Sequence, residues 1–91
     1  MNIAEKQKRF FEHLRETQDT VVAVALSKYK PGGSQEDLLC EATYETICGI
    51  MTLIDGYADS DIKLDLIDRE TGESMRTDIE LHDACEDYLR C

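Results

Sequence analysis

Apolar positions recur at three- and four-residue steps through the first part of the chain, which is the spacing of one helix face. They are Ile3, Phe10, Leu14, Thr17, Val21 and Val24. The pattern predicts a helix over residues 2–29, and Asp19 or Thr20 could cap a new start if the helix breaks. Residues 20–27 contain β-branched side chains that also suit a strand, so both helix and strand stay open for this stretch. The alternating alanines there favour the helix.

A second apolar stripe begins after Pro31, the first helix-breaking residue of the chain. Its members are Cys40, Tyr44, Ile47, Met51, Ile54 and Ala58. Ser34 predicts the N-cap and Gly56 the C-terminal cap of a helix over residues 35–55. Gly49 in its interior costs about 1 kcal/mol relative to alanine, which is tolerable if another helix crosses closely there. The broad apolar surface makes this the central helix.

The remaining part of the chain predicts a mixture of strand and helix. Residues 62–66 alternate strictly between apolar and polar side chains, as a half-buried strand does. A turn at Gly72 and a short return strand over 73–76 would complete a β-hairpin. A capping box from Thr77 then predicts a last helix over 78–89. The expected fold is α+β and mostly helical, with two long antiparallel helices, a short β-hairpin and a C-terminal helix.

Charge is distributed unevenly along the 91 residues, which leave room for a single domain (residues 1–91). The net charge is −10, with +2 over residues 1–33 and −12 over 34–91. Such a surface repels phosphate and anionic lipid, so we expect no direct nucleic-acid or membrane binding. A basic protein partner is favoured instead. The N-terminus lacks the layout of a signal peptide, which predicts a cytoplasmic protein.

The four cysteines do not form a metal or redox motif. No two of them stand in a C-x-x-C arrangement, and we expect free thiols that behave as small apolar residues. His82 and Cys85 lie three residues apart on the predicted last helix. They could form a nucleophile pair or, with two distant ligands, a zinc site. A buried Cys85 beside a His82 at the core edge is the favoured interpretation.

Carboxylates occur in patterns that suggest metal binding without matching any known site. Asp55, Asp59, Asp61 and Asp65 resemble a calcium loop, but Lys63 and Leu64 occupy positions where that loop needs a ligand and a glycine. Carboxylates at helical spacing, such as Glu80, Asp83 and Asp87, could hold magnesium between helices, but the helix over 35–55 contains no Lys or Arg to bind phosphate. We therefore predict no metal site, no cofactor and no catalytic residue.

The acidic face of the central helix is the most informative candidate site. Asp37, Glu41 and Glu45 follow one another at four-residue steps with no basic residue in that helix. They could serve solubility, pair with bases of the first helix, or bind a basic partner.

The function that the sequence favours is a small non-catalytic interaction or regulatory module that works through protein–protein contacts. The alternative is an acidic inhibitor that mimics nucleic acid and blocks a nucleic-acid-binding protein, and a metal-dependent enzyme is less favoured. The central helix has more apolar surface than one partner helix can cover, so we also expect a homodimer built on helices.

Overall fold

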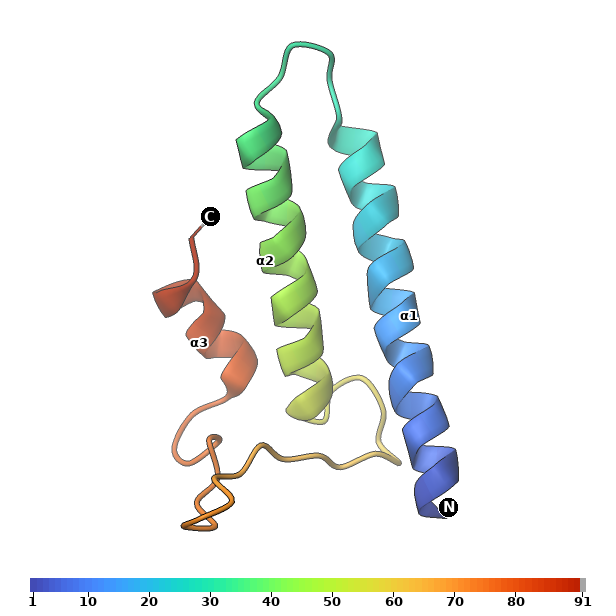
Figure 1. Ribbon diagram of the computed structural model, residues 1–91, viewed down its shortest axis with the longest axis vertical. Coiled ribbons are helices and arrows are strands. Elements are labelled where there is room, and N and C mark those ends of the chain that lie inside the picture. The colour runs from blue at the N-terminus through green and yellow to red at the C-terminus, as the bar shows by residue number, and fades with distance from the viewer. Residues whose placement is uncertain (91) are drawn as a thin grey trace.

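Three helices form the fold in the computed structural model, which describes residues 1–90: α1 (Ile3–Lys28), α2 (Gln35–Ile54) and α3 (Leu81–Tyr88). Helices α1 and α2 run antiparallel as a helical hairpin, and α3 lies along the other side of α2 (Figure 1). The long connection from α2 to α3 passes beneath the hairpin, toward the N-terminal end of α1 and back. None of the described helices is long and apolar enough to cross a membrane.

The two long helices form where the sequence predicts them. The backbone N–H of Asp37 donates to Ser34 Oγ at 3.1 Å, which confirms the N-cap of α2. Gly56 follows the end of α2 with φ of 90°, a conformation that favours glycine. Residues 20–27 are helical, and α1 continues without a break through Thr17–Asp19.

α1 and α2 approach each other closely at Gly49. A methyl group built on its Cα would lie 2.7 Å from Thr17 Cγ2. The absence of a side chain at Gly49 therefore lets the helices cross closely, which is the condition under which a glycine is tolerable there, and this contact offsets the low helix propensity of glycine.

Replacing Gly49 by alanine should destabilise the protein, although alanine is the better helix former. The added methyl group must push Thr17 or the whole of α1 away, and overpacking of this kind costs about 1–3 kcal/mol. The variant Gly49→Ala/Thr17→Ser should recover most of the loss, because serine lacks the methyl group that clashes. Urea unfolding followed by circular dichroism measures both, and a Gly49→Ala protein as stable as the parent would contradict the close packing.

The predicted β-hairpin is wrong, because the described residues contain no β-strand and the fold is all-helical. A single antiparallel bridge joins Ile67, one residue beyond the predicted strand 62–66, to Ser74 in the predicted strand 73–76. Two backbone hydrogen bonds flank this bridge, from Asp68 N–H to the Glu73 carbonyl and from Met75 N–H to the Leu66 carbonyl, and side chains add further bonds. Asp65 Oδ1 accepts from the Ser74 hydroxyl at 2.6 Å, and Asp68 Oδ1 accepts from two backbone N–H groups of the turn. The pairing is confined to the turn and does not extend along residues 62–66, so alternation alone does not form a strand.

The last helix begins at Leu81, three residues later than predicted. The Thr77 hydroxyl donates to the Ser74 carbonyl at 2.7 Å and does not cap the helix. Asp55, at the end of α2, accepts from the backbone N–H groups of Leu81 and His82 instead. The cap of α3 therefore comes from a residue distant in sequence.

Residues 55–80 join α2 to α3, and we call them the connecting segment. The apolar core is small and lies between α2, the connecting segment and α3. Its buried members are Leu53, Ile62, Leu81 and Cys85, and none of the residues of α1 is fully buried. Cys48 and Cys85 are free thiols, as expected. Cys40 is disulfide-bonded, so the expected free thiol is wrong there, and Cys91 lies outside the described residues.

Candidate functional site

Apolar side chains of α1 and α2 form one uncovered surface, which we call the hairpin face. It consists of Phe11, Leu14, Val21 and Val22 on α1 and of Leu39, Ile47 and Ile50 on α2. Five of these residues line a groove between the two helices, and Leu39 and Ile47 extend the same stripe at helical spacing from Ile50. Large members stay open to solvent, since Phe11 is 65%, Val22 51% and Leu39 64% exposed. Exposed apolar side chains gathered on one side of two helices are typical of a protein contact site.

Arg15 is the one charged residue that lines this groove. None of the acidic residues that give the chain its net charge of −10 lines it. Glu41 and Glu45, for example, line a separate groove between α1 and α2 together with Lys28. The hairpin face therefore differs from the rest of the surface both in polarity and in charge.

The acidic face predicted from the sequence is partly neutralised within the chain. Lys28 Nζ of α1 forms an ion pair with Glu41, and this contact raises the pKa of the Lys28 ammonium. Asp37 and Glu45 are exposed. Arg90 Nη2 also binds the neighbouring Glu36 at 2.7 Å. Ion pairs with Lys28 and Arg90 thus neutralise part of the negative charge on α2.

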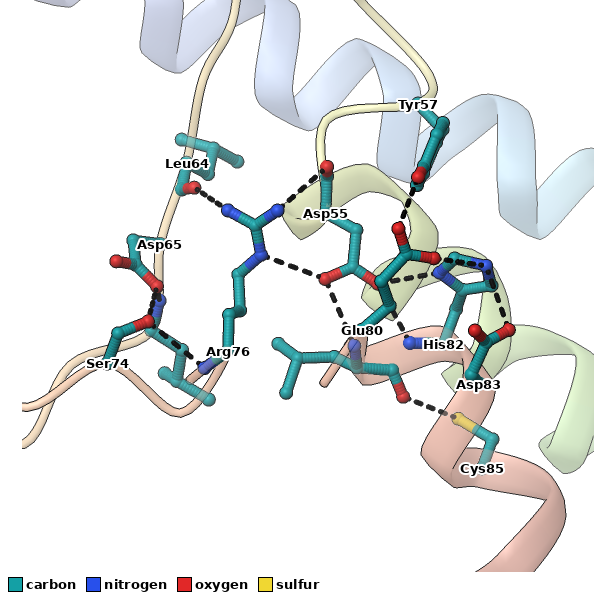
Figure 2. Close-up of polar contacts among 12 residues, drawn as sticks. Asp55, Tyr57, Leu64, Asp65, Ser74, Arg76, Glu80, His82, Asp83 and Cys85 are labelled. Carbon is teal, nitrogen blue, oxygen red and sulfur yellow. Dashed lines mark hydrogen bonds and ion pairs between the residues drawn. The ribbon is translucent and has the colours of Figure 1, made fainter. Parts of the chain in front are cut away.

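Asp55 is the centre of the densest polar network in the described part of the chain. Its side chain is fully buried and accepts from Arg76 Nε at 3.1 Å and from His82 Nδ1 at 2.6 Å (Figure 2). Two backbone N–H groups at the start of α3 complete its four hydrogen bonds. Arg76 also donates to the carbonyl groups of Asp55 and Leu64. One carboxylate therefore ties α2, the connecting segment and α3 together.

The network shifts the pKa values of its acidic and basic members in opposite directions. Burial works against ionisation of Asp55, but the bonds from His82, Leu81 and Arg76 lower the pKa of its carboxyl group below the usual value. The bond to Asp55 raises the pKa of His82, aided by the nearby Asp83. The sequence offers no signal for this network, because its members are separated by 21 to 27 residues.

A second buried carboxylate, Asp59, fixes the connecting segment to α1. It binds Arg9 Nη2 at 2.5 Å and His13 Nε2 at 2.8 Å, and its other oxygen accepts from the backbone of Asp61. The bond to His13 lowers the pKa of Asp59. Asp59 thus fixes the start of the segment to α1, and Asp55 fixes its end, through Arg76 and the first residues of α3, to the end of α2.

These contacts remove the calcium interpretation. Asp55 and Asp59 are occupied by different basic residues, Asp61 faces Arg9, and Asp65 binds Ser74. The four aspartates therefore do not converge on one point.

Glu80, His82 and Asp83 are the described residues that come closest to a metal site. Their potential ligand atoms lie within 4.8 Å of one another, and His82 Nε2 is 3.3 Å from Asp83 Oδ1 and 3.5 Å from Glu80 Oε2. A proton on Nε2, which the raised pKa of His82 favours, satisfies both carboxylates without a metal ion. Glu80 also accepts from the Tyr57 hydroxyl (Figure 2). The cluster is thus accounted for as an ion-pair network.

Cys85 and His82 do not form a nucleophile pair. Burial raises the pKa of the Cys85 thiol to about 11, and this thiol lies 3.7 Å from the Leu81 carbonyl, to which it donates. The Nδ1 atom of His82 is held by Asp55. The thiolate that catalysis requires is therefore disfavoured.

The stability of the fold should fall as pH rises from 6 to 8. Because His82 has a raised pKa in the folded state, its contribution is complete below its unfolded pKa of about 6.5 and is lost as pH rises through the folded value. Asp55 has a lowered pKa, so its contribution is lost only at acid pH. Urea unfolding at both pH values measures the difference. It should shrink in a His82→Asn variant, and an unchanged difference would assign the pH dependence to other groups.

Comparisons with family models, with curated proteins and with solved structures found no match to this chain.

Proposed function

We propose that this protein is a small non-catalytic interaction module that works through protein–protein contacts on the hairpin face. The observation that carries the proposal is the uncovered apolar surface across α1 and α2, on which Phe11, Val22 and Leu39 are each more than half exposed. Exposing such side chains to water is unfavourable, and covering them by a partner gains about 25 cal/mol per Å². The homodimer expected from the sequence belongs to this proposal, because a second copy would cover the same face.

The engagement of the reactive side chains supports a non-catalytic role. Cys85 is buried with a raised pKa, and both histidines are held by buried carboxylates. The acidic inhibitor that mimics nucleic acid has less support, since Lys28 pairs with Glu41 and Arg90 with Glu36. The contact surface that the geometry favours is apolar.

Photocrosslinking in the native cell tests this function. A benzophenone amino acid at position 22 should capture a protein on irradiation, because Val22 lies on the hairpin face and its side chain is exposed. The same group at position 23 is the matched control, since Ala23 is exposed but projects about 100° away around the helix. Capture at position 22 and not at position 23 supports the proposal. Equal or absent capture at both positions would contradict it.

A further inference from the structure

Seen down the shortest axis of the molecule, the three helices lie side by side with α2 between α1 and α3 (Figure 1), and α2 contacts both neighbours. The overall extents are 48 × 29 × 20 Å. Stable domains are normally built from at least two packed layers, since each helix must bury its apolar stripe against another element. α1 and α3 cover two sides of α2, and α2 covers one side of α1, whereas no described element covers the exposed side chains of the hairpin face.

The exposed area is much larger than that of a compact monomer of this size. A 10.4 kDa monomer has an accessible surface of about 5,400 Å² by the scaling of folded proteins, whereas this chain exposes 7102 Å². Its radius of gyration of 15.4 Å likewise exceeds the value of about 12 Å expected for 91 residues. The excess of about 1,700 Å² falls within the range of about 1,000–2,500 Å² that obligate homodimers bury per chain.

Charge favours a second copy on this face over any other approach of two copies. Each chain carries a net charge of −10, so two copies repel each other across most orientations. The groove of the hairpin face contains no carboxylate, and Arg15 is its one ionisable group. Contact between two hairpin faces therefore keeps the acidic surfaces apart while it buries the apolar ones.

We infer that the hairpin face binds the hairpin face of a second copy of this chain. The dimer is two-fold symmetric, so the same surface is buried on both chains. The α1–α2 hairpins of the two copies pack against each other as a four-helix bundle. Phe11, Val22 and Leu39 lie in the core of this interface. The inference rests on the proposed function, because it names the partner of the same surface.

Light scattering coupled to gel filtration measures the mass of the full chain directly. The expected mass at tens of micromolar protein is twice 10.4 kDa. Val22→Glu and Leu39→Glu should each reduce the measured mass to that of one chain, because the interface would have to take a carboxylate out of water in place of an apolar side chain. Ala23→Glu is the control and should leave the doubled mass unchanged. A parent protein with the mass of one chain, or a Val22→Glu protein that stays dimeric, would overturn the inference.

Two further measurements cover the case in which the separated chains unfold. The melting temperature of the parent should rise with protein concentration, as it does for a dimer that melts to unfolded monomers. The benzophenone group at position 22 should also give a covalent dimer in purified protein, and the group at position 23 should not. A concentration-independent melting temperature without a covalent dimer would exclude the dimer. If position 22 still captures a different protein in the cell, the proposed function survives while this inference fails.

Discussion

Replacing Asp55 by asparagine should lower the free energy of unfolding by about 3 kcal/mol, because it breaks a buried charge network. Removing one partner of a fully buried pair costs about 3–5 kcal/mol, and the lower end applies since Arg76 and His82 are 33% and 27% exposed. The amide also has the wrong hydrogen-bonding groups. Asp55 Oδ2 accepts from two N–H groups of His82, and an amide nitrogen in its place would face them with hydrogens of its own.

The melting temperature should fall by about 15 °C in the Asp55→Asn variant, since 1 kcal/mol corresponds to about 4–8 °C in a domain of this size. Asp87→Asn is the matched control, because it makes the same chemical change at an exposed position of α3. It should change the free energy of unfolding by less than about 0.5 kcal/mol. Equal effects of the two substitutions, measured by urea unfolding at pH 6, would show that the network does not hold the fold together.

The sequence predicts the two long helices well because their signals are local. Ser34 caps α2 by accepting from the backbone N–H of Asp37, three residues later. Gly49 lies within the apolar stripe of α2, where the glycine leaves room for Thr17 of α1. Residues 20–27 are the instructive case. Their β-branched side chains fit a strand, yet no second strand lies beside them, and the helical period of the whole segment prevails.

The sequence cannot predict the C-terminal part equally well, because distant residues determine it. The start of α3 depends on a cap supplied by Asp55, which lies 26 residues before Leu81. The alternating residues 62–66 do bury Ile62, but a strand also needs a partner strand, and Asp65 and Asp68 bond to nearby groups instead. The hairpin face could be predicted from the sequence only in part. Its excess of apolar positions on α2 is visible in the sequence, whereas its extension across Phe11 and Val22 requires the packing of α1.

Replacing Ile62 by alanine should lower the free energy of unfolding by about 3 kcal/mol, because Ile62 is 1% exposed and such truncations leave a cavity. It is one of four buried apolar residues, and it joins the connecting segment to a core whose other members lie on α2 and α3. Ile67→Ala is the matched control, since Ile67 is 53% exposed on the same segment and should lose less than about 1 kcal/mol.

Exposure of the Cys85 thiol gives a second measure of the same change. This buried thiol reacts only when the core opens, so a loss of about 3 kcal/mol should speed its modification about 100-fold, at tenfold for each 1.4 kcal/mol. Modification of Cys85 is followed by peptide mass spectrometry in the parent, Ile62→Ala and Ile67→Ala proteins. An acceleration in Ile62→Ala alone shows that the connecting segment belongs to the core that holds α3. Equal rates in all three would mean that the segment lies on the surface and that the polar contacts of Asp55 alone hold α3 against α2.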